Sequence, residues 1–470
     1  MKTPCYIGGK AVTSETLLDV IYPYTGEIVG QVCMVGQPEL ERAITSMRAG
    51  GDPLTRHQRF EILDSARRLL GERADEFANL IRSESGLCMR ETRYEVGRAQ
   101  DVLQFASMEA LKDDGQIFSC DVTPHGKARK IFTTREPLRS IAAITPFNHP
   151  LNQVAHKLAP AIAVGAPMIL KPSEKTPLTA IRLAELFYEA GLPGWMLSVL
   201  VGPIDTVVEP MIRDERIELV SFTGSIAIGK HIADIAGYKK ICLELGGNSP
   251  LIVLEDADLQ KAVGLAAEGC YRNSGQRCTA VKRILVHRDI VDGFTSAMVE
   301  KTKEYRAGDP ADPETRVGTV IDEAAAIDLE RRVQDATAAG ARVLIGGGRD
   351  GAQMEATVIA EVPRDVEMVR TESFGPLAPI IAIDDLDDAI DLANSTGYAL
   401  SCGIVTNDLS RALEAVKRVR TGTVNVNEIP GYRIECSPFG GVENSGLGIK
   451  EGVIEAMKFM TNVKTFSLPW

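Results

Sequence analysis

The sequence has no hydrophobic run long enough to cross a membrane and no C-x-x-C pair. No stretch approaches 18 consecutive apolar residues, and residues 1–10 contain no apolar core of signal-peptide length. The nine cysteines are odd in number and irregularly spaced, which disfavours a disulfide framework or a zinc site. We therefore expect a cytoplasmic protein with no membrane segment and no metal centre.

Positive charge is also scarce, since 52 Lys and Arg stand against 64 Asp and Glu, a net charge of -12. Nucleic acids and anionic membranes attract Lys/Arg-rich surfaces, so neither is expected as a partner, although a local basic pocket remains compatible with this balance. The chain has no internal repeat and no low-complexity linker. Its 470 residues exceed what one hydrophobic core usually holds, which predicts two or three domains.

What the chain does have is a regular alternation of strands and helices. Residues 39–111 have the apolar spacing of helices. Between about 140 and 255, strands are predicted at 140–144, 167–171, 196–201 and 217–222, with helices at 178–190 and 207–213. A second alternating stretch has strands predicted at 281–286, 341–345, 377–383, 403–406 and 422–426. This pattern indicates βαβ units and parallel sheets, which bind ligands at the carboxyl ends of their strands.

Three shorter segments are predicted as strands outside this alternation. They lie at 116–122, 128–134 and 460–470. The last is apolar yet expected to be exposed, and pairing with another subunit would explain its character.

Three polar residues have side chains suited to catalysis. A cysteine such as Cys278 becomes a nucleophile as its thiolate. A carboxylate such as Glu244 can activate water, and an amide such as Asn148 can donate to a developing oxyanion. Taken singly, each residue has a plainer interpretation: a buried structural cysteine, an ion-paired glutamate and a turn asparagine.

Taken together and in order, the motifs around these residues resemble those of the aldehyde dehydrogenase superfamily over nearly the whole chain. The matching segments are Thr145-Pro-Phe-Asn148, Leu170-Lys-Pro-Ser-Glu174, Phe222-Thr-Gly-Ser225 with Gly229, Glu244-Leu-Gly-Gly-Asn248, Gly275-Gln-Arg-Cys278, Glu372-Ser-Phe-Gly-Pro376 and Pro438-Phe-Gly-Gly441. An unrelated α/β protein, or a non-catalytic scaffold on this fold, remains a remote alternative.

The resemblance implies an α/β fold in three parts. A Rossmann-type NAD-binding domain would use residues 1–117 and 138–245, and a catalytic α/β domain residues 246–445. A small bridging β-sheet for oligomerisation would use residues 118–137 and 446–470, so a homodimer or homotetramer is expected.

The resemblance also implies roles. Cys278 would attack the aldehyde, Asn148 and the Cys278 backbone N–H would hold the oxyanion, and Glu244 would activate water to release the acid. The residues expected to bind the cofactor are Thr145, Pro146, Phe147, Lys171, Ser173, Glu174, Gly224, Ser225, Gly229, Leu245, Gly246, Glu372 and Phe374. Because a carboxylate accepts from ribose hydroxyls but repels a 2′-phosphate, Glu174 favours NAD over NADP. One departure is Ile449-Lys450, where many members carry Arg-Glu.

Charge near the nucleophile indicates a small anionic aldehyde. The residues expected to bind it are Arg98, His149, Arg277 and Arg433. Each arginine could instead be a surface residue or part of an internal ion pair, and Arg277 could serve only to lower the pKa of Cys278.

Two subfamilies share these charged residues. The segment from Gly275 to Arg283 is similar to non-phosphorylating glyceraldehyde-3-phosphate dehydrogenases. With Phe147-Asn-His-Pro150 and the stretch from Tyr432 to Gly441, it looks more like phosphonoacetaldehyde dehydrogenases. We therefore expect oxidation of phosphonoacetaldehyde to phosphonoacetate, with glyceraldehyde 3-phosphate and succinic semialdehyde as alternative substrates.

Overall fold

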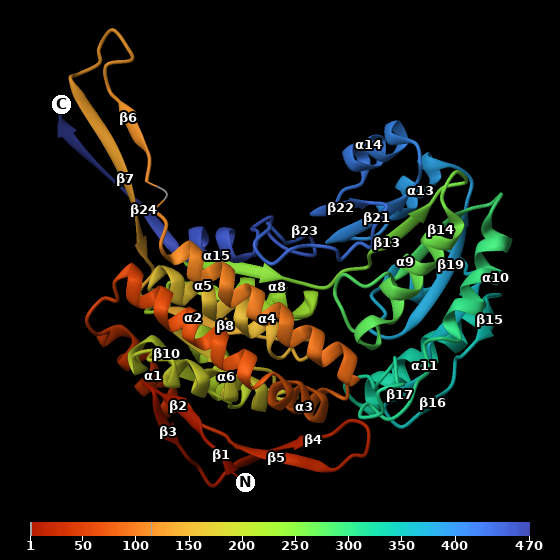
Figure 1. Cartoon of the computed structure of the whole chain (residues 1–470), viewed down its shortest axis with the longest axis horizontal. Helices are drawn as coiled ribbons and strands as arrows, with labels where there is room; N and C mark the ends of the chain where they lie inside the picture. The colour runs from red at the N-terminus through yellow and green to blue at the C-terminus, as the bar shows by residue number, and fades with distance from the viewer. Residues whose placement is uncertain (1, 114) are drawn as a thin grey trace.

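The computed structural model describes residues 2–113 and 115–470. They form two lobes, each built on a seven-stranded sheet, and a narrow three-stranded arm that projects from the first lobe (Figure 1). The α/β class expected from the sequence is confirmed. Within these described residues, no helix combines the length and apolar character that crossing a bilayer requires.

The sheet of the first lobe holds most of the strands predicted between 140 and 255. Its order is β12 (Lys240–Glu244), β11 (Leu219–Thr223), β8 (Ile141–Ile144), β9 (Met168–Lys171), β10 (Leu197–Val199), β2 (Cys5–Ile7) and β3 (Lys10–Val12). The strands from β12 to β10 are parallel to one another. β2 pairs antiparallel with both of its neighbours, β10 and β3. The carboxyl ends of four parallel strands that carry predicted site residues therefore meet at one edge.

The helices of the first lobe include those predicted within 39–111, at 178–190 and at 207–213. They are α1 (Gln37–Ala49), α2 (Arg56–Glu72), α3 (Ala74–Ser85), α4 (Met89–Ala110), α5 (Asn152–Val164), α6 (Pro177–Glu189), α7 (Glu209–Arg213) and α8 (Ile226–Ala236). A π-helical turn, Ile204–Val208, precedes α7 and occupies the start of the predicted helix. A small sheet of β1 (Lys2–Thr3), β5 (Ile28–Cys33) and β4 (Leu17–Ile21) was not predicted.

The sheet of the second lobe separates two hydrophobic cores. Its order is β15 (Arg342–Ile345), β18 (Thr357–Ala360), β19 (Leu377–Ile383), β14 (Arg283–His287), β13 (Pro250–Val253), β21 (Ser401–Val405) and β22 (Thr423–Val426), and only β15 is antiparallel. On β13, Ile252 packs into one core while Leu251 and Val253 pack into the other, as the two-residue period of a strand requires.

Six helices belong to this second lobe. They are α9 (Leu259–Tyr271), α10 (Val291–Thr302), α11 (Glu323–Ala338), α12 (Glu367–Arg370), α13 (Leu386–Ala393) and α14 (Leu409–Arg418). Two short strand pairs complete it: β16 (Arg349–Asp350) with β17 (Gln353–Met354), and β20 (Tyr398–Ala399) with β23 (Val442–Glu443).

The arm consists of β6 (Ile117–Ser119), β7 (Arg129–Pro137) and β24 (Thr461–Pro469). The predicted exposed strand at the carboxyl terminus is confirmed, with Trp470 73% exposed. β24 pairs antiparallel with β7 of the same chain along its whole length, and its other edge pairs with no strand among the described residues, so pairing with another subunit stays a prediction. Residues 446–460 were predicted to belong to the arm, but α15 (Val453–Phe459) packs into the core of the first lobe.

Arg283 on β14 joins separate segments of the second lobe through buried hydrogen bonds. It is fully buried, and its guanidinium donates to the carbonyl oxygens of Asn248 (3.0 Å), Leu392 (2.7 Å) and Ala393 (3.0 Å). Ala393 is the last residue of α13, so the cation also sits at a helix carboxyl terminus, where positive charge is favourable. Burial lowers the pKa of Arg283 to about 10.

The first prediction concerns this anchor. Arg283→Ala should lower the free energy of unfolding by about 3 kcal/mol, because it leaves three buried carbonyls without a donor and opens a cavity. Chemical denaturation measures the change. Arg342→Ala removes an exposed arginine with one ion pair to Glu361 and should change stability by less than about 0.5 kcal/mol. Equal effects of the two substitutions would contradict the anchoring role.

Candidate active site

Cys278 follows a short, strained turn between α9 and β14. Asn273, Ser274 and Gly275 in this turn have φ of 57°, 51° and 69°, in the left-handed region. A Cβ at Gly275 would lie 2.0 Å from the carbonyl oxygen of Gly375, so only glycine fits there. Strained residues cost about 1–3 kcal/mol each and persist where the surrounding structure holds them. The turn is therefore a rigid support for the cysteine.

Two amides join this turn to the loop after β8. Asn273 Nδ2 donates to the carbonyl oxygens of Asn148 (3.0 Å) and Gln276 (3.3 Å). Asn148 Nδ2 donates in turn to the Gln276 carbonyl oxygen at 2.8 Å. Because an amide nitrogen carries two hydrogens, one N–H of Asn148 is left for another acceptor. At Gly247 a Cβ would lie 2.2 Å from the Cys278 carbonyl oxygen, so the loop after β12 also approaches closely.

The Cys278 thiol is partly exposed in a region of mixed charge. Burial of the sulfur, and then the negative charge of Glu372, raise the pKa of Cys278 to about 12. The cations that oppose this rise most strongly are Arg433 and Lys282. The thiol is therefore protonated at neutral pH in the cofactor-free protein.

Arg277 does not point its charge at the sulfur. Its Nη2 donates to the carbonyl oxygens of Glu268 (3.3 Å) and Gly269 (3.0 Å) in α9. Burial lowers the pKa of Arg277 to about 10. The hypothesis that Arg277 acts chiefly to lower the pKa of Cys278 therefore loses support, since Arg433 and Lys282 have the stronger influence.

Glu244 ends β12 and carries a buried carboxylate without a donor. Neither carboxylate oxygen has a hydrogen-bond partner among the described residues. Burial, and then the negative charge of Glu451, raise the pKa of Glu244 well above its usual range. Gly440 allows close approach, since a Cβ there would lie 2.6 Å from Glu244 Oε1. A carboxylate with free lone pairs and a raised pKa is suited to accept a proton.

Glu451 is a site residue that the sequence reasoning missed. The motif there was noted for lacking Arg-Glu at Ile449 and Lys450, but a buried carboxylate follows one residue later. The Glu451 carboxylate accepts from Lys157 Nζ at 2.8 Å, and Lys157 also donates to Ser221 Oγ. The glutamate directly after Lys450 was the signal that could have found it.

The four residues predicted to bind an anion influence one another electrostatically. The charge of Arg98 on α4 acts on His149, Arg277 and Arg433 and lowers the pKa of each. Arg433 and Cys278 also act on each other. Arg98 and Arg433 both reach Glu435, while His149 and Arg277 directly follow Asn148 and Gln276, which are hydrogen-bonded to each other.

Glu435 balances part of this positive charge and was given no role from the sequence. Its carboxylate accepts from Arg98 Nε at 2.5 Å, contacts His156 Nε2 at 2.5 Å and lies 3.7 Å from Arg433 Nη2. Arg433 also stacks 4.0 Å above the ring of Phe439. One carboxylate thus offsets one of the arginines, and positive charge remains in excess.

All the predicted cofactor residues except Glu372 and Phe374 lie at or beyond the carboxyl ends of strands in the first sheet. Thr145, Pro146 and Phe147 follow β8; Lys171, Ser173 and Glu174 follow β9; Gly224, Ser225 and Gly229 follow β11; Leu245 and Gly246 follow β12; and Glu372 and Phe374 precede β19. Parallel sheets bind nucleotides at such an edge.

The start of α8 fits a pyrophosphate. Ser225 caps the helix, with its Oγ accepting the N–H of Ile228 at 3.4 Å. A Cβ at Gly229 would lie 2.4 Å from Leu245 Cδ2, so glycine lets the helix pack closely. Helix amino termini attract anions. On β9, Lys171 donates to the Glu174 carboxylate.

Glu372 and Phe374 border the Cys278 loop. Glu372 Oε1 accepts the N–H of Gly247 at 3.3 Å, and burial, opposed by Lys282, raises the pKa of Glu372 to about 7. Phe374 meets Phe147 edge to face, with ring centroids 5.9 Å apart. These residues fit the nicotinamide end of a dinucleotide that reaches from α8 toward Cys278.

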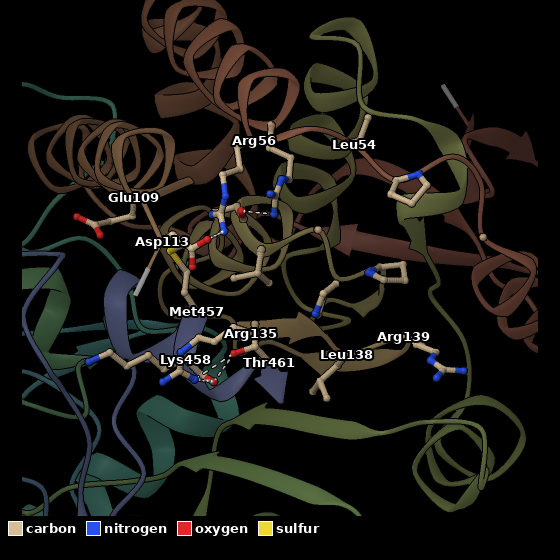
Figure 2. Close-up of a pocket in the computed structure, with 18 of the residues that line it drawn as sticks. Leu54, Arg56, Glu109, Asp113, Arg135, Leu138, Arg139, Met457, Lys458 and Thr461 are labelled. Atoms are coloured by element: carbon tan, nitrogen blue, oxygen red, sulfur yellow. Dashed lines mark hydrogen bonds and ion pairs between the residues drawn. The ribbon is translucent and has the colours of Figure 1, made fainter. Parts of the chain in front are cut away.

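No group of three or more His, Cys, Asp or Glu side chains in the described ranges is placed to hold a metal ion. A cavity of about 630 Å³ lies away from Cys278, at the base of the arm (Figure 2). Apolar side chains such as Leu138 and Met457 line it together with Arg56 and Arg135. None of the predicted site residues is among those that line it.

Comparison with known proteins agrees with this geometry. Residues 10–466 match the model of the aldehyde dehydrogenase family. The chain is 37% identical over 464 residues to the 3-sulfolactaldehyde dehydrogenase of Priestia aryabhattai, covering 98% of this chain and 97% of that protein. It is 37% identical over 469 residues to the lactaldehyde dehydrogenase of Methanocaldococcus jannaschii, covering 98% and 99%.

A solved structure gives the same result. The glyceraldehyde-3-phosphate dehydrogenase GapN of Methanocaldococcus jannaschii, complexed with NADP, superposes with a TM-score of 0.93 at 36% identity, covering 98% of this chain and 100% of that chain. The chain therefore belongs to the aldehyde dehydrogenase family and is an oxidoreductase that acts on aldehydes with NAD or NADP.

Proposed function

We propose that this enzyme oxidises a short anionic aldehyde, and that phosphonoacetaldehyde, converted to phosphonoacetate in phosphonate breakdown, is its substrate. The observation that carries the proposal is that Arg98 and Arg433 meet at the Glu435 carboxylate, while Arg277 adjoins Cys278 and His149 adjoins Asn148. Glu435 lies against Arg98 and Arg433, and Glu95 lies beside His149, so the three arginines keep an excess of positive charge for an anionic group. Arginine suits phosphonate because its planar fork donates to two oxygens at once.

A sulfonated aldehyde is the second candidate. A relative of 37% identity is called 3-sulfolactaldehyde dehydrogenase, and a sulfonate is a compact anion similar in shape to a phosphonate. Glyceraldehyde 3-phosphate and succinic semialdehyde remain alternatives. The single carboxylate of succinic semialdehyde would leave more of the buried positive charge unbalanced.

In the proposed reaction the Cys278 thiol gives its proton to solvent water, and the sulfur then bonds to the aldehyde carbon, whose oxygen becomes an oxyanion. The free N–H of the Asn148 amide and the Cys278 backbone N–H donate to the oxyanion. A bound nicotinamide cofactor would accept the hydride that leaves the aldehyde carbon. Loss of this hydride leaves a thioester between that carbon and the Cys278 sulfur. Glu244 then takes a proton from water, whose oxygen attacks the thioester carbon, and the acid leaves as the carbon–sulfur bond breaks.

NAD is proposed as the cofactor in preference to NADP. The Glu174 carboxylate would accept from ribose hydroxyls and repel a 2′-phosphate. Lys171, which donates to Glu174, weakens that repulsion, and the solved relative contains NADP. We therefore expect a preference for NAD and some use of NADP.

Assembly and location complete the proposal. The arm exposes apolar side chains, among them Phe118, Val463 and Trp470, which a homodimer or homotetramer would cover. A cytoplasmic location suits a chain whose nine cysteines are all free in the described part of the structure.

Cys278→Ala should abolish aldehyde oxidation, because no sulfur remains to bond to the carbonyl carbon, and should leave NAD binding unchanged. The rate of NADH formation measures aldehyde oxidation, and calorimetric titration with NAD measures cofactor binding. Cys120→Ala, which removes another partly exposed cysteine from the arm, is the matched control and should keep full activity. Dehydrogenase activity remaining in Cys278→Ala would refute the assigned nucleophile.

Glu244→Gln should slow the release of the acid about a hundredfold or more, the usual contribution of a general base. Rapid mixing should then show a burst of NADH, near one per active site, before a slow steady state. Because burial raises the pKa of Glu244, the wild-type steady-state rate should fall as the pH drops through that raised value, when the carboxylate takes up a proton. A wild-type steady state without a burst would show that another group is the base.

The substrate assignment predicts the order of kcat/KM for four aldehydes, each tested with NAD and NADP. Phosphonoacetaldehyde should exceed glyceraldehyde 3-phosphate and succinic semialdehyde by about a hundredfold, nearly 3 kcal/mol of transition-state discrimination. If 3-sulfolactaldehyde gives the highest value, the anionic site stands and the second candidate replaces the first. Similar values for all four would reject the proposed role of the cationic residues.

A further inference from the structure

Glu95 and His149 form a buried pair beside the cationic residues, and the proposed reaction gives Glu95 no role. Glu95 lies on α4 and is 1% exposed. Its Oε1 accepts the backbone N–H groups of Leu151 (2.8 Å) and Asn152 (2.9 Å) at the start of α5. One carboxylate oxygen is therefore held in place by a helix amino terminus.

The other carboxylate oxygen has no donor. Glu95 Oε2 lies 3.5 Å from His149 Nδ1, beyond hydrogen-bond distance, and both atoms are buried without a partner among the described residues. A buried polar atom left unpaired is costly, and an unpaired charged oxygen is more so. A proton on Nδ1 of His149, with a small movement of either side chain, would satisfy both atoms at once.

The groups that face His149 explain why a second proton, which would convert the ring to the imidazolium, is conditional. Burial disfavours the imidazolium, and the charge of Glu95 favours it. Arg98 on α4 and Arg277 on the Cys278 loop disfavour it. An anion bound among these cations would cancel the repulsion and favour a protonated His149.

We propose that Glu95 is a positioning residue that makes His149 responsive to the charge of the substrate. The Glu95 carboxylate holds Nδ1–H of His149, the ring takes up a proton from solvent as an anionic substrate binds, and Nε2–H donates to the anionic group. The inference rests on the proposed function only in taking the substrate to be anionic. It predicts that a neutral aldehyde gains nothing from the pair.

A ratio of rates isolates this effect. Cys278 and Glu244 titrate in the reaction of every aldehyde, so dividing kcat/KM for phosphonoacetaldehyde by kcat/KM for propionaldehyde removes their contribution. Ionisation of the substrate itself is common to all variants and cancels when they are compared. The ratio should be measured between about pH 5.5 and 9, a range that includes the ordinary pKa of histidine, about 6.5.

Glu95→Gln is the informative variant, because glutamine keeps an oxygen for the two backbone N–H groups, removes the charge and replaces the oxygen that faces His149 with an N–H donor. The ratio at pH 7.5 should fall about tenfold, and its decline with rising pH should begin about one pH unit lower than in the wild type, since the imidazolium loses its carboxylate partner. His149→Asn should give a low ratio of kcat/KM values. The pH dependence that comes from titration of His149 should be absent in this variant.

Glu84→Gln is the matched control. Glu84 is also fully buried and accepts two backbone N–H groups, of Leu178 (2.8 Å) and Thr179 (3.1 Å), at the start of α6, but no histidine faces it in the described structure. The ratio of kcat/KM values for Glu84→Gln, and its pH profile, should be the same as those of the wild type. Should Glu95→Gln fail to fold, calorimetry of phosphonoacetate binding in two buffers of different ionisation enthalpy should detect proton uptake by the wild type and less uptake by His149→Asn.

The outcomes separate this inference from the substrate assignment. If Glu95→Gln keeps the wild-type ratio and pH profile, or if phosphonoacetate binds without proton uptake that depends on His149, the role of Glu95 is refuted while the substrate proposal stands. If another anionic aldehyde is the better substrate, the same comparison with that aldehyde decides the role of Glu95. If the wild type prefers propionaldehyde, both the inference and the anionic substrate are refuted.

Discussion

The left-handed turn at Asn273, Ser274 and Gly275 is the constraint on which the geometry around Cys278 depends. Its backbone leaves no room for a Cβ at Gly275, and the Asn273 side chain fastens the loop that carries Asn148. The nucleophile Cys278 and the oxyanion donor Asn148 belong to different lobes of the structure. Neither lobe could therefore bring the two residues together alone. The energy stored in such a turn is supplied by packing elsewhere.

Around this support the protein buries charges whose partners are incomplete. Among the described residues, Glu244 has no donor, Glu95 has donors for only one oxygen, and Lys157 donates to both Glu451 and Ser221. In a low-dielectric interior such groups are costly, and they respond strongly to any charge that enters. A site built in this way discriminates by charge as well as by shape. Structural charges such as Arg283, which satisfies three carbonyls, do not respond in the same manner.

In the arm, the backbone pairing and the exposed apolar side chains have to be considered separately. Pairing of β24 with β7 satisfies the backbone groups along one edge of the tail within one chain, while β24 remains an edge strand of the described sheet. It does not cover the apolar side chains on the faces of the sheet, such as Val463 and Phe466. The open edge of β24 and the exposed apolar side chains of the arm are therefore the features that the proposed homo-oligomer would cover.

The sequence by itself determined the α/β class, the parallel strands from β8 to β11 and the family, because strand periodicity and ordered motifs are local properties of the chain. The position of Cys278, Glu244 and Asn148 at strand and helix ends followed from the same patterns. Which charges meet was decided only by the tertiary structure. Glu435 reaches Arg98 across 337 positions, and Glu451 reaches Lys157 across 294. Arg277, one residue from the thiol, turns its charge toward α9 instead, since side-chain direction depends on the fold and not on sequence distance.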